Sequence, residues 1–318
     1  MQASAKAHSN LALVKYWGKR DIDRNLPAVS SLSITLDAIW TSMDVTFGDF
    51  PADALSVLGE PRDDMLPRVS RCLDSVAGAD RQFASIDSES NFPIGAGLAS
   101  SASSFAALVV AANQACGGNH HREEMARLAG AASGSAARSL YGGFVLLTAG
   151  ESAIDVQQIA DVDDWPLNVV IAITEERSKP VGSGEAMIRS AQTSPFYGSW
   201  LEQQSDDIQT ASAAVAARDF AALAAVSEHS CLKMHSVMWT SRPSIVYWNK
   251  ATIACMEAVR QLQSEGHGVF FTIDAGPQVK AVCLPGSTDR VASELAGVAG
   301  VRRTIVSKLG DGARVLSE

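Results

Sequence analysis

One glycine- and serine-rich stretch constrains the fold of this chain more than any other feature. Residues 91–110 read NFPIGAGLASSASSFAALVV, so a proline and two glycines lead into four serines and then into an apolar run. The apolar run predicts a helix from Ser101 to Ala115, and RQFASIDSES ahead of it predicts a strand. Glycines let a backbone approach a phosphate closely, and the unpaired N–H groups at a helix start attract anions. The stretch alone favours two interpretations about equally: an anion-binding loop, or a small-residue helix start that packs against a neighbour.

Two common nucleotide-binding motifs do not describe this stretch. No Gly-Lys-Ser/Thr follows the glycines, which excludes a Walker A loop, and the pattern is not a GxGxxG that follows a Rossmann strand. Serine is unfavourable inside helices, so four serines at the predicted helix start add weight to anion binding.

Composition limits the classes of protein to which the chain can belong. With 318 residues, 47% of them hydrophobic and 19% charged, it can form a packed core in one large domain or two ordinary ones. The net charge of −9 argues against a nucleic-acid-binding surface, which needs clustered basic residues. A local basic pocket for a small anionic molecule remains compatible with it.

Cysteine content and hydropathy predict a cytoplasmic protein without a membrane anchor. The five cysteines are odd in number and scattered, with no CxxC, which argues against a disulfide framework or a zinc site. The N-terminal residues MQASAKAHSN contain no long apolar segment of a secretory signal. Apolar runs such as LNVVIAIT are strand-sized rather than membrane-spanning.

Strands and helices are predicted without the regular alternation of a Rossmann sheet. Residues 30–47 alternate between apolar and polar side chains and predict a strand, and DDMLPRVSRCLDSVAGA predicts an amphipathic helix. The polar segment Glu175–Ser194 is the best candidate for a boundary or mobile loop. Helices are predicted after it at Pro195–Thr210, Ala211–Ala225, Val226–Ser241, Ser244–Gly266 and Thr288–Ala296, with strands at GVFFTID, VKAVCLP and near Arg302–Leu309. The pattern predicts an α+β fold with two lobes.

Two further stretches carry cations that suit an anionic ligand. HSNLALVKYWGKRD, residues 8–21, places Lys15, Lys19 and Arg20 around two aromatic residues. SGSAARSLYGGF, residues 133–144, places Arg138 among serines, and its fork of N–H donors matches a carboxylate or phosphate. Taken alone, the first stretch is more simply a solvated edge, and the simpler interpretation of Arg138 is an arginine that caps a helix C-terminus, which is common.

An acidic residue ends a late apolar strand in GVFFTIDAGPQVKAV, residues 268–282. Asp274 is either a turn-forming residue before Ala-Gly-Pro, the commoner case, or a catalytic base at a sheet edge. Lys280 follows on the next predicted strand, where a solvated strand charge is the simplest expectation.

Taken in order along the chain, these segments resemble the diphosphomevalonate decarboxylase family of the GHMP kinase superfamily. The serine-rich stretch matches the superfamily phosphate loop, Pro-x-x-x-Gly-Leu-x-Ser-Ser, and KYWGKR and IDAGPQVK are the most specific matches. The resemblance is carried by NLALVKYWGKRD, NLPAVSSLSITLD, NFPIGAGLASSASSFAAL, SGSAARSLYGGFV, TSPFYGSW, MHSVM with PSIVYW, and FTIDAGPQVK.

The resemblance implies a fold, a reaction and an assembly. It implies the α+β GHMP kinase fold, with a ribosomal-S5-like ATP-binding lobe over residues 1–175, a ferredoxin-like lobe over residues 176–318, and the active site between them. It implies ATP- and Mg²⁺-dependent decarboxylation of (R)-mevalonate 5-diphosphate to isopentenyl diphosphate, ADP, phosphate and CO2, in the mevalonate pathway of isoprenoid biosynthesis. It also implies a homodimer.

The resemblance further implies roles for individual residues. Asp274 matches the catalytic aspartate placed against the substrate 3-hydroxyl, Arg138 matches the arginine that holds the substrate carboxylate, and Lys15 lies beside the same pocket. The positions implied for the substrate are Tyr16, Trp17, Lys19, Ser133, Ser135, Arg138 and Ser183. The positions implied for ATP are Pro93, Gly95, Gly97, Leu98, Ser100, Ser101 and Ser104, with Ser101 as the candidate Mg²⁺ ligand.

One departure from the family pattern leaves alternatives open. Residues 182–187 read GSGEAM, and Gly184 stands where many members of the family have an arginine that can touch the terminal phosphate of the substrate. The alternatives are therefore a decarboxylase of mevalonate 5-phosphate or a mevalonate 3-kinase, and Lys179 or Arg189 could replace the arginine. The presence of Arg138 favours decarboxylation. A catalytically silent homologue that serves as a sensor or binding partner is disfavoured because Asp274 and the basic pocket are both retained.

Overall fold

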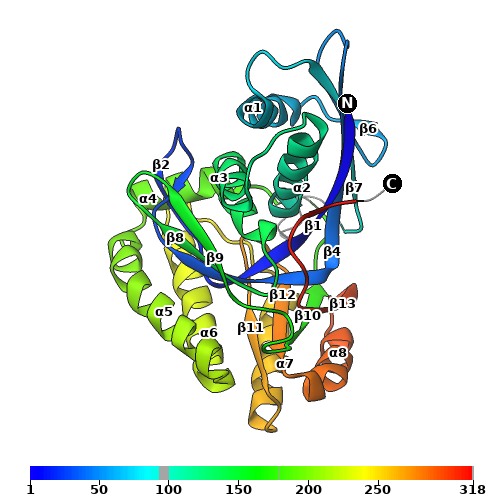
Figure 1. Ribbon diagram of the computed structural model, residues 1–318. Helices are drawn as coiled ribbons and strands as arrows, with labels where there is room; N and C mark the ends of the chain where they lie inside the picture. Colours follow the sequence, from blue (N-terminus) through cyan, green and yellow to red (C-terminus); the bar gives the residue numbers. More distant parts are fainter. Residues whose placement is uncertain (93–99, 178, 317–318) are drawn as a thin grey trace.

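The chain folds around two main β-sheets that lie one above the other (Figure 1). The computed structural model describes residues 1–92, 100–177 and 179–316. Four predicted ATP-binding residues, Pro93, Gly95, Gly97 and Leu98, lie outside the described residues. None of the helices in the described ranges has the length and apolar character needed to cross a membrane.

The first sheet contains eight of the described strands. Its main path follows the order β14-β1-β4-β7-β5-β6, and β8 pairs with both β4 and β9. The strands are β1 (Gln2–Val14), β4 (Ser31–Gly48), β5 (Ala54–Val57), β6 (Glu60–Pro61), β7 (Phe83–Ser90), β8 (Phe144–Ala149), β9 (Ile154–Ala160) and β14 (Arg314–Val315). Three helices cover one face of this sheet, namely α1 (Leu66–Ala77), α2 (Ser100–Ala115) and α3 (Arg122–Ala132) (Figure 1).

The predicted strand over residues 30–47 is confirmed as β4, but only its second half shows the alternating burial of a half-exposed strand. Its first six residues are all buried. Leu32, Ile34 and Leu36 share a hydrophobic cluster with Phe270 and Val282 of the second sheet, so this end of β4 lies between the lobes. The long strand therefore fixes how the lobes sit relative to each other.

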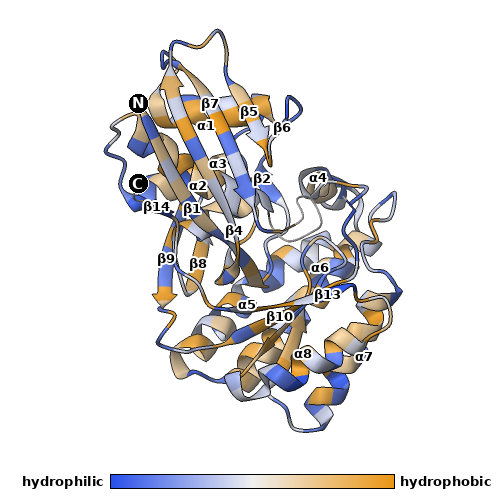
Figure 2. Cartoon of the chain, turned by 90° about the vertical axis from the view of Figure 1, so that its right-hand side faces the viewer, coloured by the Kyte–Doolittle hydropathy of each residue, from blue (hydrophilic) through white to orange (hydrophobic). Residues whose placement is uncertain are grey.

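The second sheet is antiparallel, with the order β11-β12-β10-β13. Its strands are β10 (Asn168–Ile173), β11 (Val269–Thr272), β12 (Val279–Cys283) and β13 (Arg303–Lys308). The helices of this region are α4 (Ser183–Thr193), α5 (Tyr197–Ala217), α6 (Phe220–Trp239), α7 (Lys250–Ser264) and α8 (Thr288–Gly297). Figure 2 shows α4 at the level where the two lobes meet. Smaller elements are the β2 (Lys19–Asp21) and β3 (Leu26–Pro27) hairpin and the 3-10 helices η1 (Ala136–Leu140) and η2 (Pro285–Ser287).

Three helix boundaries differ from those predicted: the breaks after Thr210 and after Ala225, and the start at Ser244. The break after Ala225 is wrong because α6 runs without interruption from Phe220 to Trp239. The predicted break after Thr210 is wrong, because α5 continues to Ala217 and ends where Arg218 adopts a left-handed conformation with φ 54°. The carboxylate of Asp219 then caps α6 by accepting from the N–H of Ala222. The last long helix begins at Lys250 rather than Ser244, because a capping box starts it there.

The loop predicted over Glu175–Ser194 is also partly wrong. Residues Ser183–Thr193 form α4, although Gly182 and Gly184 flank its first residue. The buried side chains of α4 are Ala186, Met187 and Ser190, so tertiary packing of one face overrides the glycine content.

The division into lobes at residues 175 and 176 stays a prediction. The chain changes sheets between the end of β9 at Ala160 and the start of β10 at Asn168. It returns to the first sheet at β14, which pairs with β1.

Candidate active site

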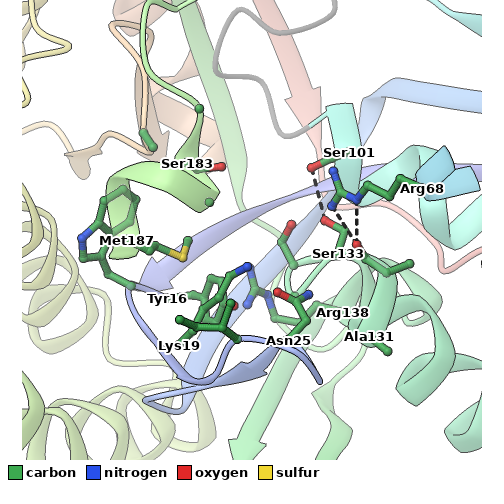
Figure 3. Close-up of a pocket in the computed structure, with 18 of the residues that line it drawn as sticks. Tyr16, Lys19, Asn25, Arg68, Ser101, Ala131, Ser133, Arg138, Ser183 and Met187 are labelled. Carbon is green, nitrogen blue, oxygen red and sulfur yellow. Dashed lines mark hydrogen bonds between the residues drawn. The ribbon is translucent and has the colours of Figure 1, made fainter. Parts of the chain in front are cut away.

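A cavity of about 750 Å³ lies between the two lobes (Figure 3). Its wall brings together Asp274 from the β11–β12 turn, Arg138 from η1 and Ser101 from the start of α2. Figure 3 shows Ser183 and Met187 on one side of this space and Ser101, Ser133 and Arg68 on another, with Arg138 between them. The residues therefore come from segments that are far apart in the sequence.

The carboxylate of Asp274 forms ion pairs with two ammonium groups, one at each oxygen. Lys15 Nζ lies 2.7 Å from Oδ1 and Lys280 Nζ lies 3.3 Å from Oδ2. The side chain is 23% exposed. Burial alone would raise the pKa of Asp274, but the two lysine charges and their hydrogen bonds outweigh burial and hold the pKa below its usual value. Asp274 is therefore ionised at neutral pH.

The expectation that Lys280 is a solvated strand charge is wrong. Its side chain is 2% exposed, since β12 is an inner strand of the second sheet and all its residues are buried. A strand with one face in solvent exposes every second side chain. Strand β12 is covered on both faces, so a charged side chain on it is buried.

Lys15 follows β1 and is fixed by contacts from both lobes. Its ammonium also donates to the carbonyl of Ala12 at 2.8 Å. Its backbone N–H donates to Ser230 Oγ at 3.0 Å, and its carbonyl accepts from Gln204 Nε2 at 2.8 Å. Both partners belong to helices of the C-terminal part, so the position of Lys15 depends on how the lobes pack.

Arg138 is buried at the back of the cavity rather than capping a helix. Its Nη1 donates to Ser31 Oγ at 2.7 Å, and its Nε and Nη2 donate to Asn10 Oδ1 at 3.2 and 3.0 Å. Asn10 in turn donates to the carbonyl of Ser135 and to Ser139 Oγ. Burial lowers the pKa of Arg138 to about 10, against the opposing charge of Asp274. The guanidinium is still charged at neutral pH and is held rigidly.

Sequence reasoning missed Asn10. An amide that directly precedes the apolar run Leu11–Val14 in β1 was the available signal, because a buried amide needs partners.

The residues predicted for the substrate all line the cavity: Tyr16, Trp17, Lys19, Ser133, Ser135, Arg138 and Ser183. Tyr16 depends on a glycine, because a Cβ on Gly134 would lie 2.3 Å from its hydroxyl oxygen. Trp17 is 1% exposed and mainly packs with Trp200 and other apolar residues. Lys19 is half-buried, and burial followed by the charge of Arg68 lowers its pKa.

The start of α2 forms the serine-rich side of the cavity. Ser100 and Ser101 line it, and Ser133 Oγ donates to Ser101 Oγ at 3.3 Å. Ser104 does not line the cavity as the structure describes it. A helix start with exposed hydroxyls is suited to phosphate oxygens.

Further cations face this space, among them Arg68, Arg71 and Lys179, of which only Lys179 was considered from the sequence. Arg68 and Arg71 of α1 line it, and Arg68 donates through Nε and Nη2 to the carbonyl of Ala132. Lys179 donates to the carbonyl of Ala275 at 3.0 Å, and burial lowers its pKa to about 8. The arginines lie on the polar face of a helix, where sequence alone cannot separate cavity-lining from solvated charges.

The donor set fits a magnesium ion that arrives on phosphates. Within the described ranges, no group of three or more His, Cys, Asp or Glu side chains could hold a metal ion. Mg²⁺ usually keeps several waters and binds through substrate phosphates and one or two protein oxygens. The hydroxyl of Ser101, on the cavity wall, is an oxygen of this kind.

Comparison with known protein families gives this arrangement a context. A model of the diphosphomevalonate decarboxylase-like N-terminal domain matches residues 7–160, and a model of the mevalonate 5-diphosphate decarboxylase C-terminal domain matches residues 169–304. The chain belongs to the diphosphomevalonate decarboxylase family. The resemblance expected from the sequence is thereby confirmed.

Individual relatives agree with this assignment. Diphosphomevalonate decarboxylase of Saccharomyces cerevisiae is 34% identical over 301 residues, which cover 86% of this chain and 76% of the relative. The crystal structure of mevalonate diphosphate decarboxylase from Staphylococcus aureus has a TM-score of 0.93 at 33% identity and covers 99% of this chain and 98% of its own. A structure of MDDEF in complex with MVAPP, AMPPCP and magnesium has a TM-score of 0.93 at 31% identity. The match covers 100% of this chain and 99% of that chain. The α+β GHMP kinase fold is confirmed.

Proposed function

We propose that this chain catalyses the ATP- and Mg²⁺-dependent decarboxylation of (R)-mevalonate 5-diphosphate to isopentenyl diphosphate, ADP, phosphate and CO2. One observation carries the proposal: a single cavity is lined by Asp274, Arg138 and Ser101. These supply a carboxylate for the alcohol, a guanidinium for the carboxylate and a helix start for the ATP phosphates. The relatives that cover nearly the whole chain are diphosphomevalonate decarboxylases, which does not favour a 5-phosphate decarboxylase or a 3-kinase.

Asp274 acts on the 3-hydroxyl in the first step. The hydroxyl oxygen attacks the γ-phosphorus of ATP, the bond to ADP breaks, and the hydroxyl proton passes to Asp274. Two lysines keep the pKa of Asp274 low, so the carboxylate is a weak base. It therefore orients the hydroxyl by accepting its hydrogen bond and takes the proton late, as suits a loose phosphoryl-transfer transition state.

Arg138 acts on the carboxylate in the second step. The C3–O bond breaks as phosphate leaves with the bonding electrons, and the electrons of the bond to CO2 form the alkene. Asn10 and Ser31 occupy three of the five guanidinium N–H groups of Arg138. One N–H on each terminal nitrogen remains for the substrate carboxylate. These two donors orient the carboxylate through hydrogen bonds and leave CO2 free to depart.

The phosphate groups of both ligands face cations and helix amides. We propose that Lys15, Lys19 and Lys179 offset the negative charge of the phosphates. The hydroxyls of Ser100 and Ser101 would contact the phosphates of ATP. When bound, Mg²⁺ would offset the charge of the ATP phosphates, with Ser101 as its protein oxygen. Tyr16, Ser133, Ser135 and Ser183 complete the substrate side, and Trp17 supports it by packing.

Lys19 is the cation best placed to replace the family arginine at position 184. A Cβ built on Gly184 would lie 4.0 Å from Lys19 Nζ, so the two positions face the same space. Arg189 pairs with Glu185, and Lys179 is tied to Ala275 beside Asp274. We therefore assign the terminal phosphate of the substrate to Lys19.

A substrate panel tests the proposed reaction. The protein is supplied with ATP, Mg²⁺ and either mevalonate, its 5-phosphate or its 5-diphosphate, and ADP and CO2 are followed separately. The proposal expects both products with the diphosphate. Turnover with the monophosphate but not the diphosphate would identify the other decarboxylase, and ADP without CO2 would identify a kinase.

The assembly, location and lobe boundaries are proposals of the same kind. We propose a homodimer, as the family resemblance implies, with a mass in solution of twice 33.5 kDa by light scattering. A cytoplasmic location is supported by the five free cysteines. The lobes are proposed to meet near residue 175, and Pro93, Gly95, Gly97, Leu98 and Ser104 remain proposed contacts of the ATP loop.

A further inference from the structure

Lys280 is a buried lysine that the reaction scheme above leaves without a role. It lies on β12, where it is in register with Ile171 of β10 and Thr272 of β11. Its ammonium is 3.3 Å from Oδ2 of Asp274. The cavity wall, as far as the structure describes it, includes Asp274 and Lys15 but not Lys280. Lys280 therefore reaches the reacting groups through Asp274.

Stability alone does not explain a lysine at this position. The neighbours of Lys280 on β12, Val279 and Ala281, are fully buried, and an apolar side chain would suit the same layer. Replacing buried ion pairs by apolar residues is often neutral or stabilising. Here two ammonium groups surround one carboxylate, which leaves a local excess of positive charge. That excess is favourable once anionic ligands fill the cavity.

We propose that Lys280 is a positioning residue that fixes the Asp274 carboxylate from Oδ2 and keeps it ionised for the reaction. This inference rests on the proposed function. The carboxylate torsion of an aspartate is broad, so a single contact from Lys15 on Oδ1 leaves the plane of the group free to turn. A second ammonium on Oδ2 locks that plane, and each oxygen keeps lone-pair capacity for the substrate hydroxyl.

Among the residues that the structure describes, no other charge near Asp274 would take over this role. Arg138 is engaged by Asn10 and Ser31, and Lys179 by the carbonyl of Ala275. The remaining titratable neighbours, on α6, are neutral: burial lowers the pKa of His235 to about 3 and raises that of Cys231 to about 11. An opposite charge at this range lowers a carboxyl pKa by about 1–3 units, so removing Lys280 should raise the pKa of Asp274 by a similar amount.

The kinetic test compares two buried lysines. Lys280→Met removes the charge and keeps an unbranched side chain that is one atom shorter. Lys233→Met is the matched control, because Lys233 Nζ lies 2.6 Å from Asp207 Oδ2 and both are largely buried away from the cavity. We expect kcat of Lys280→Met to fall about tenfold or more, with KM for both substrates within about threefold. Lys233→Met should stay within about twofold of the parent. If Lys280→Met does not fold, Lys280→Gln, which keeps a donor without the charge, takes its place.

A second readout does not depend on turnover. With ¹³C-labelled aspartate carboxyls, the Asp274 signal is assigned by its loss in Asp274→Asn, and its titration is followed from pH 7 downward. The inference expects a midpoint higher by about one pH unit or more in Lys280→Met than in the parent. An unchanged titration overturns the electrostatic role, and a kcat within twofold of the parent, or an equal loss in Lys233→Met, overturns the positioning role. If the parent protein turns over no substrate but the titration shifts, the proposed reaction fails and the effect of Lys280 on Asp274 stands.

Discussion

The ammonium of Lys15 lies 2.7 Å from Oδ1 of Asp274, although 259 residues separate the two in the chain. Lys15 follows the first strand of one sheet, and Asp274 follows the first strand of a hairpin in the other. The pair forms when the two parts of the chain pack together. The geometry around Asp274 therefore depends on how the two lobes pack.

Asp274→Asn should stop the first chemical step. The amide keeps the size of the side chain but cannot accept the hydroxyl proton, so ADP release should fall by about 10²–10⁴-fold. Nucleotide binding should stay largely intact, because the serine-rich helix start is untouched. ADP release and the affinity for a non-hydrolysable ATP analogue are the measurements, and near-normal ADP release would remove Asp274 from the mechanism.

Arg138→Lys should separate phosphoryl transfer from decarboxylation. Lysine cannot reproduce the fork that Asn10 and Ser31 hold in place, so the substrate carboxylate loses its orientation. We expect kcat/KM for CO2 release to fall about a hundredfold. ADP release should fall less, so the ratio of ADP to CO2 should rise above that of the parent. Equal loss of both products would instead assign Arg138 to an earlier step.

The pH–rate profile should fall on its alkaline side because of Lys179. Burial lowers the pKa of Lys179 to about 8, so the ammonium is charged below that pH and neutral above it. If the charged form holds phosphate, kcat/KM should decline about tenfold per unit above pH 8, and Lys179→Met should lose this decline along with much of the rate at pH 7. Lys250→Met, at an exposed helix start, should keep it.

Unfolding does not account for that decline. Between about pH 8 and the ordinary lysine pKa, the unfolded chain binds more protons at Lys179 than the folded chain does. The contribution of Lys179 to the free energy of unfolding of the ligand-free protein therefore increases with pH in this window. A melting temperature measured across the same range checks this, since a drop that parallels the rate would point to another group.

Gly184→Arg should sharpen the preference for the diphosphate. A Cβ at this position meets only the ammonium of Lys19 among the described atoms, at 4.0 Å, so the first side-chain carbon of an arginine fits without a clash. A second cation beside Lys19 should lower KM for the 5-diphosphate about tenfold relative to the 5-phosphate. Gly184→Met has similar bulk without charge and should leave the ratio of the two KM values unchanged. If both variants change the ratio alike, side-chain size and not charge is responsible.

Periodicity in the sequence located most elements of the fold but not the ends of several helices. The helix at the serine-rich stretch and the late strands were predicted within a residue or two. The end of α5 was missed, because Ala211–Ala217 contains no helix-breaking residue and the stop depends on a left-handed Arg218. Helix α4 was missed because its glycines suggested a loop, and packing against the lobe junction decided otherwise.

Sequence motifs pointed to the main residues of the candidate site, but not to the residues that hydrogen-bond or ion-pair with them. Asp274, Arg138 and Lys15 stand in recognisable sequence contexts, from which their roles were predicted. Asn10 contacts Arg138, which lies more than 100 positions away, and local sequence does not encode such a contact. Lys280 is close to Asp274 in the sequence, but the pair forms only because the β11–β12 turn and the burial of β12 bring the ammonium back to the carboxylate. The cations of α1 lie on a polar helix face that any solvated helix would share.

The ratio of CO2 to ADP released from (R)-mevalonate 5-diphosphate tests the central claim most directly. The substrate carries ¹⁴C in its carboxyl group, and both products are counted in the same reaction with ATP and Mg²⁺. A site that couples Asp274 to Arg138 in one cavity predicts one CO2 for each ADP. ADP formed without CO2, with a phosphorylated product that accumulates, would contradict it.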